Sequence, residues 1–144
     1  MKLFKKQLNL LIEVLAETKP HFVEARLRDK VIKLIVVENT QFDEDRVKIC
    51  KELCIKDDKG EPLTKENHFD FTPENMTKFQ EEFLILSEEE IKLPLDEQEQ
   101  QRLLKLIETT EYLPKVGEVS LIDEILGEIK PNEDIPSPKE FLPE

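Results

Sequence analysis

The sequence predicts a mainly α-helical protein: a compact domain of about five helices with a minor β-hairpin or short two-stranded sheet, plus a disordered C-terminal tail. Apolar residues recur at spacings of three and four along most of the 144 residues, and capping residues mark helix starts at Thr72 and Asp96. Four of the nine prolines fall within residues 131–144. We therefore expect one helical domain over residues 1–129 and a Pro-rich, acidic tail over residues 130–144.

The first part of the chain predicts two or three helices. Apolar stripes run through residues 3–15, a helix that Pro20 ends, and through residues 23–38. The run Asn-Thr-Gln at 39–41 either breaks the second helix or lies within one continuous, bent helix. We favour the break, with Asp43 capping a third helix.

Residues 54–72 are expected to form a loop or hairpin insertion. Gly60 supplies a residue that tolerates positive φ for a turn, and residues 68–71 alternate polar and apolar side chains as an edge strand does. Residues 91–95 alternate in the same way. We expect them to form a short strand that pairs with residues 68–71 or with the segment near Ile55.

Three helices are predicted in the second half. Thr72 is an N-cap hydroxyl and Pro73 suits the first helical position, so a helix should extend to about Ser87. Asp96 caps a helix that Pro114 stops, and a last short helix covers residues 120–129. The apolar residues that we expect the first of these helices to bury are Met76, Phe79, Phe83, Leu84 and Leu86, and Tyr112 extends the apolar face of the second.

The formal net charge of −12 lies entirely in the second half of the chain. Residues 1–72 carry 14 Lys plus Arg and 14 Asp plus Glu, whereas residues 73–144 carry 7 and 19. Such a half repels nucleic acid and anionic membrane surfaces, so we expect a protein partner, no nucleic acid and no membrane. The acidic half either binds a basic surface or only keeps the protein soluble. The residues that we single out as partner-binding candidates are Glu88, Glu89, Glu90 and, in the tail, Phe141 and Leu142.

No pattern of catalytic or cofactor-binding residues stands out. With three glycines the chain has neither GxGxxG nor GxxxxGK[ST], and its two histidines and two cysteines lack the spacing of a zinc site. Cys50 and Cys54 lie on one apolar helix face and are expected to be reduced core thiols. We expect no enzyme, no cofactor and no metal.

The N-terminal segment reads as an amphipathic helix, because Asn9 and Glu13 interrupt the apolar stretch that a signal peptide or membrane span requires. We therefore expect a cytoplasmic protein. The apolar stripes of the helices pack within one chain or continue into a homo-oligomer or a partner's groove.

Residues 26–34, with their alternating Arg, Lys and aliphatic side chains, are followed by three segments: DDKGEPLTKENHFDF, ENMTKFQEEFLILSEEEIKLPL and VGEVSLIDEILGEI. This order of elements resembles a family of small, uncharacterised proteins encoded by phages and prophages of Gram-positive bacteria, and the resemblance covers residues 1–129. It implies a phage origin and a role in the host cytoplasm or in particle assembly, with association with the virion left open. It brings no catalytic residue with it.

Two functional hypotheses follow. The first is a non-enzymatic phage protein that binds another protein as an assembly or accessory factor. The second is an acidic inhibitor of a host nucleic-acid-binding defence enzyme, whose carboxylates imitate phosphate.

Overall fold

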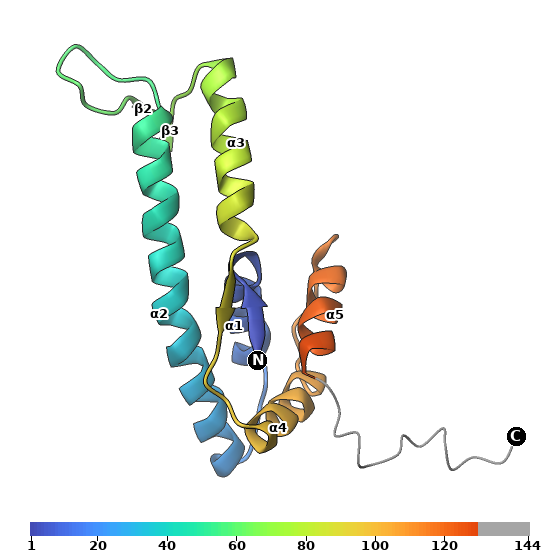
Figure 1. Ribbon diagram of the computed structural model, residues 1–144. Helices are drawn as coiled ribbons and strands as arrows, with labels where there is room; N and C mark the ends of the chain where they lie inside the picture. Colours follow the sequence, from blue (N-terminus) through green and yellow to red (C-terminus); the bar gives the residue numbers. More distant parts are fainter. Residues whose placement is uncertain (130–144) are drawn as a thin grey trace, which may run out of the picture.

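The structure, a computed structural model, describes residues 1–129, and these residues are mainly helical, as the sequence predicts (Figure 1). They form five α-helices, one short 3₁₀ helix and two small antiparallel sheets. The elements in chain order are β1 (Lys2–Phe4), the 3₁₀ helix (Lys5–Gln7), α1 (Leu8–Ala16), α2 (Phe22–Leu53), β2 (Thr64–Lys65), β3 (His68–Phe69), α3 (Pro73–Ser87), β4 (Glu90–Lys92), α4 (Glu97–Glu108) and α5 (Glu118–Glu128).

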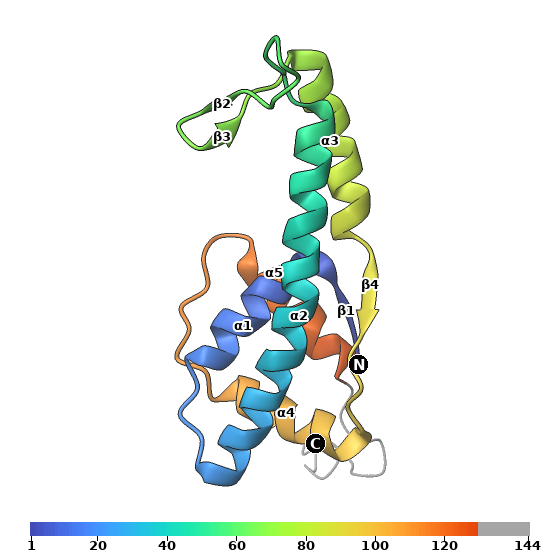
Figure 2. The ribbon, with the colours of Figure 1, turned by 90° about the vertical axis from the view of Figure 1, so that its left-hand side faces the viewer.

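The hydrophobic core lies at one end of the molecule, which we call the body. There α1 packs against α2, α4 and α5, and the β1–β4 sheet covers the same core (Figures 1 and 2). Helix α1 buries five of its nine side chains and leaves one stripe, Asn9, Glu13 and Ala16, exposed to solvent. The large apolar side chains that are least accessible in this core are Leu3, Leu8, Leu11, Leu15, Ile35, Leu103, Ile125 and Ile129.

The second half of α2 extends away from the body with α3 beside it, and we call residues 36–87 the arm (Figure 2). The main core cluster contains no residue of α2 beyond Ile35. Within the arm, the two helices are joined by a series of stacked aromatic rings. Ring centroids are 5.7 Å apart for Phe42 and Phe83, 5.7 Å for Phe79 and Phe83, and 5.3 Å for Phe71 and Phe79.

The expected break in α2 is wrong, since the helix runs without interruption through residues 39–41 and Asp43. Asn39 and Thr40, the weaker helix formers of this run, cost at most about 0.7 kcal/mol each. Burying the ring of Phe42 against α3 stabilises the continuous helix by about 2 kcal/mol or more. The Gln41 side chain also donates a hydrogen bond of 2.9 Å to Asp45, one turn later. Packing therefore outweighs local propensity here.

The expected helix over residues 3–15 begins later than predicted, because residues 2–4 form strand β1. This strand pairs with β4 in the register Leu3↔Ile91, so the expected pairing of residues 91–95 with residues 68–71 or Ile55 is also wrong. The buried Gln7 side chain accepts a hydrogen bond of 2.9 Å from the Phe4 amide and so helps to end the strand. Strand β1 forms because a partner 86 to 90 residues away supplies the hydrogen bonds.

The insertion at 54–72 is a hairpin at the far end of the arm. Strands β2 and β3 pair antiparallel across Glu66 and Asn67, both of which have positive φ, as a tight two-residue hairpin turn requires. A single bridge joins Lys56 and Pro62 around Gly60, whose φ of +79° confirms its expected role in the turn.

Both predicted N-caps are confirmed. The Thr72 hydroxyl accepts from the Asn75 amide at 3.2 Å, and the Asp96 carboxylate accepts from the Glu99 amide at 2.7 Å in a capping box. The expectation that α3 buries its whole apolar set is wrong: Leu86 is buried, Phe79 and Phe83 are half-buried, and Met76 and Leu84 are exposed. Two helices packed alone cannot cover that many apolar positions.

Tyr112 lies beyond the end of α4, in the segment that leads to α5. The titration of its hydroxyl tests whether this segment is held by the hydrogen bond described next. Its hydroxyl donates to Glu118 over 2.8 Å. This hydrogen bond to a carboxylate, together with partial burial, raises the pKa of Tyr112 to about 12. Because the folded-state pKa is raised, the stabilisation is fully present below the ordinary pKa of about 10 and is lost as the pH rises toward 12.

Tyr112 is the chain's one tyrosine and there is no tryptophan, so near-ultraviolet tyrosinate absorbance reports it alone. We expect the absorbance midpoint near pH 12 in the wild-type protein and a clearly lower midpoint in Glu118→Gln. Glu111→Gln, which removes a nearby charge without touching this hydroxyl, serves as the control. Identical midpoints in wild type and Glu118→Gln would show that the hydrogen bond does not form.

Candidate functional site

The acidic candidates Glu88, Glu89 and Glu90 lie where α3 passes into β4, and two of them are paired with lysines of the N-terminal segment. Lys5 Nζ lies 2.6 Å from Glu89 Oε2, and Lys6 Nζ lies 2.8 Å from Glu88 Oε1. The hydrogen bond to Glu88 is the largest cause of the raised pKa of Lys6.

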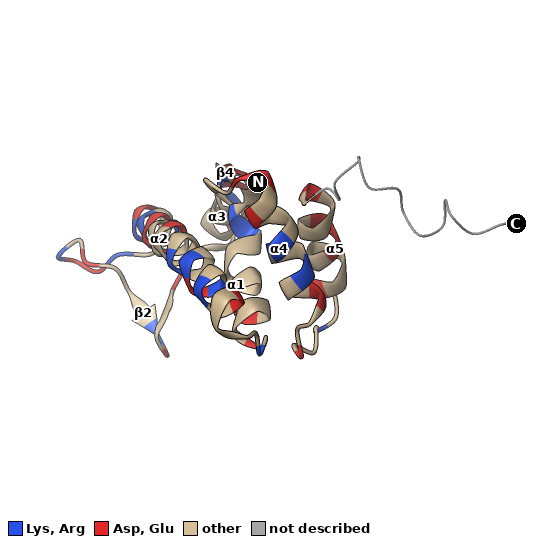
Figure 3. Cartoon of the chain, turned by 90° about the horizontal axis from the view of Figure 1, so that it is seen from below, with Lys and Arg blue, Asp and Glu red and all other residues tan. Residues whose placement is uncertain are grey.

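Seen from below, acidic residues dominate the charged positions of α5, whereas acidic and basic residues alternate along α2 (Figure 3).

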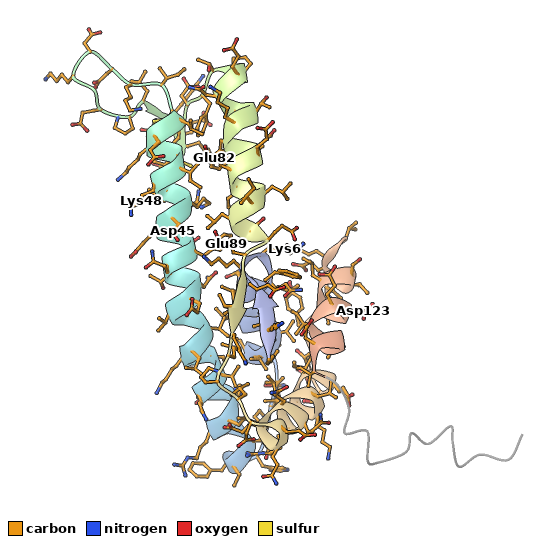
Figure 4. All side chains as sticks on the ribbon, in the orientation of Figure 1. Lys6, Asp45, Lys48, Glu82, Glu89 and Asp123 are labelled. Atoms are coloured by element: carbon orange, nitrogen blue, oxygen red, sulfur yellow. The ribbon has the colours of Figure 1, made fainter. Side chains whose placement is uncertain are left out.

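The lysine–glutamate ion pairs link the first residues of the chain to the base of the arm (Figure 4). Pairs of this kind on a protein surface contribute modestly to stability, and salt screens them. Their consequence for recognition is larger, since a carboxylate that already faces a lysine presents little free negative charge to a partner. Glu90 is exposed in β4, opposite Phe4. Phe141 and Leu142 lie outside the described residues.

The arm exposes aliphatic side chains on the faces that do not form its seam. Val37 on α2 is 69% exposed and Ile85 on α3 is 67% exposed, with Val36 and Leu84 also exposed beside them. Isolated exposed hydrophobic residues are common; here two consecutive ones on each arm helix lie away from the Phe42–Phe83 seam, where a partner can reach them. We call Val36, Val37, Leu84 and Ile85 the arm set.

The sequence contained a signal for the arm set that the helical pattern obscured. Residues 34–37 and 83–86 are runs of four consecutive apolar residues. One face of a helix takes up positions three or four apart, so a run of four must place at least one side chain outside that face. Such runs therefore predict either a helix buried on all sides or an exposed apolar surface, and only the packing distinguishes them.

A cavity of about 440 Å³ lies between the start of α2 and α4. It contains His21, Glu24 and Glu111, residue types that could exchange protons in an enzyme. Both carboxylates are held in ion pairs, Glu24 with Arg102 at 3.0 Å and Glu111 with Lys19 at 3.2 Å. Within residues 1–129 no carboxylate accepts a hydrogen bond from the His21 ring, so the cavity lacks an aligned acid–base pair.

The remaining candidates are structural. Cys50 and Cys54 are buried and unpaired, as expected for core thiols, and burial is the main cause of the raised pKa of Cys50. Among the described residues no three His, Cys, Asp or Glu side chains gather where they could hold a metal ion. No helix in this part of the chain is long and apolar enough to cross a membrane.

Comparison with known proteins adds no relative to this description. No family model, no curated protein and no solved structure matches the chain.

Proposed function

We propose that this is a phage-encoded, non-enzymatic protein that binds another protein through its arm. The observation that carries the proposal is the shape of α2, which continues for 18 residues beyond the last core contact at Ile35 with α3 as its companion. That length corresponds to about 27 Å of helix. An extension of this size, carrying exposed aliphatic side chains, is suited to reach into or along a partner.

The arm set supplies apolar side chains that a partner can bury. Burying one aliphatic side chain of this size contributes about 1.5 kcal/mol or more before the costs of association are subtracted. Stacked aromatic rings hold the two helices of the arm together, so little ordering of the arm's backbone is required on binding. The mode of recognition that fits is packing of helices against a partner's apolar groove.

The phage origin rests on the resemblance described above, and the partner is then a phage or host protein met in the host cytoplasm or during particle assembly. No observation favours the second hypothesis, inhibition of a nucleic-acid-binding enzyme. Its leading residues Glu88 and Glu89 are paired with Lys6 and Lys5, which leaves few of their charges free to imitate phosphate.

The proposal is tested by replacing one aliphatic side chain of the arm with a charged one. We expect Ile85→Glu to weaken binding to the partner captured from infected cells by at least tenfold, because a carboxylate cannot be buried in an apolar contact without a large desolvation cost. Leu113→Glu is the matched control, since Leu113 is 85% exposed and lies outside the arm. The Kd of each variant is measured by calorimetry against the purified partner.

Circular dichroism of both variants checks that they keep the wild-type helix content. Equal affinities for wild type and Ile85→Glu would contradict the proposal. So would the failure of the wild-type protein to capture any partner from infected cells.

A further inference from the structure

We propose that copies of this protein associate head to tail through the body, with the outer face of the first part of α2 in one copy packed on the outer face of α5 in the next. On α2 this surface ends at Lys33, one turn before Val37 of the arm set, and on α5 it lies outside the arm. The proposal rests on two faces of opposite charge, each with exposed apolar residues, that lie on opposite sides of one molecule.

The first face, which we call the basic face, consists of Phe22, Val23, Arg26 and Lys33, with Asp29 between the last two and in an ion pair with Arg28 at 3.1 Å. These residues point away from the buried row formed by Leu27, Val31 and Ile35, and Phe22 and Val23 are both exposed. The Arg26 guanidinium lies over the Phe22 ring, 5.8 Å from its centroid. Among the described residues no carboxylate pairs with Arg26 or Lys33.

The second face, which we call the acidic face, consists of Val116, Val119, Asp123 and Gly127. Residues 119 and 123 lie on the side of α5 opposite the buried Ile125, and Gly127, one turn later, borders the groove between α5 and Phe4 of β1. Figure 4 shows Asp123 pointing away from the body, and no cation among residues 1–129 pairs with it. Gly127 leaves open space at its Cα, since an added Cβ would meet nothing within 4 Å, so another helix can approach closely there.

The two faces suit each other chemically. Each combines exposed aliphatic or aromatic side chains with a net charge, since Asp29 on the basic face is paired with Arg28, and among residues 1–129 neither Lys33 nor Asp123 has a partner of opposite sign. Helix α5 carries four acidic residues and no Lys or Arg, whereas residues 22–35 of α2 carry four Lys or Arg and two acids. This complementarity identifies a second copy of the chain as the occupant, because one molecule supplies both halves of the contact.

The position of the faces sets the symmetry of the assembly. Helix α1 lies between α2 and α5 and contacts both, so the basic and acidic faces are directed to opposite sides of the body (Figures 1 and 3). Two faces on opposite sides cannot satisfy each other within one closed two-fold dimer. The contact is therefore heterologous, and repeating it generates a ring or an open filament.

The test is sedimentation velocity of the full chain over a concentration series from micromolar to millimolar. In low salt we expect the average mass to rise beyond that of two copies of the 16.9 kDa chain, and to fall toward one copy in high salt. Lys33→Glu and Asp123→Lys should each weaken association by at least tenfold. An equimolar mixture of the two variants, or the double variant, should regain it, because the reversed charges again face each other.

Controls separate this contact from general charge effects and from the arm. Lys48→Glu and Glu81→Lys make the same charge changes on the arm, and we expect both to associate as wild type does. Ile85→Glu should also assemble normally, so loss of partner binding and loss of assembly are distinguishable. A wild-type monomer at every concentration in low salt, a mass that stops at two copies, or a double variant that stays monomeric would overturn the proposal.

Discussion

Thr40→Pro should separate α2 from α3 in the arm. We expect the packed (closed) arrangement of these two helices to lose about 3 kcal/mol or more of free energy relative to the separated (open) one. Thr40 is an exposed residue in the middle of α2, where proline removes a backbone donor and its ring clashes with the carbonyl one turn earlier. The readout is the reactivity of the chain's two cysteines, Cys50 and Cys54, which the closed arm buries. We expect their labelling rate to increase by about a hundredfold or more.

Thr40→Ala is the matched control. Alanine is a better helix former than threonine, so this variant should label as slowly as wild type or more slowly. Unchanged labelling in Thr40→Pro would mean that residues 39–41 already interrupt the helix, which is the arrangement that the sequence favoured and the structure does not have.

The body is expected to respond most strongly to Leu103→Ala, with a loss of about 3 kcal/mol in the free energy of unfolding. Leu103 on α4 is completely buried in the core cluster, and its removal leaves a cavity that the surrounding helices α1 and α2 fill only in part. Urea denaturation followed by circular dichroism measures the change, which should lower the midpoint with little effect on the slope.

Leu84→Ala removes the same atoms from an exposed position on the arm and should change stability by no more than about 0.5 kcal/mol. A loss as large as that of Leu103→Ala would mean that Leu84 is covered in the monomer, and the arm set would then not be available to a partner. Comparable small losses in both variants would contradict the position of the core at α4.

How far the sequence predicts this fold depends on whether a feature is local. The N-caps at Thr72 and Asp96 and the turn at Gly60 are specified by neighbouring residues, and all three are confirmed. Strand β1 is different, because its hydrogen bonds come from β4. Nothing within residues 2–4 identifies that partner, whereas the apolar spacing of the segment fits a helix as well as a strand.

The same distinction applies to the candidate binding residues. The sequence pointed to Glu88 and Glu89 as a run of charge, but it could not show that Lys6 and Lys5, more than 80 residues earlier, would neutralise them. The exposed arm set was hidden for a related reason. Whether Ile85 is buried depends on how many helices surround α3, and that number is a property of the tertiary structure.

Because α2 is one uninterrupted helix, a tilt of its first half moves the far end of the arm. The helix has 32 residues, so it is about 48 Å long, and its first half is fixed between α1 and α4 while its second half projects. A tilt of about 5° about Ile35 moves the far end of the arm by about 2 Å. A force that a partner exerts on the hairpin at 54–72 therefore acts on the contacts of α2 with α1 and α4. The lysine–glutamate ion pairs at the base of α3 oppose the resulting rotation of the arm.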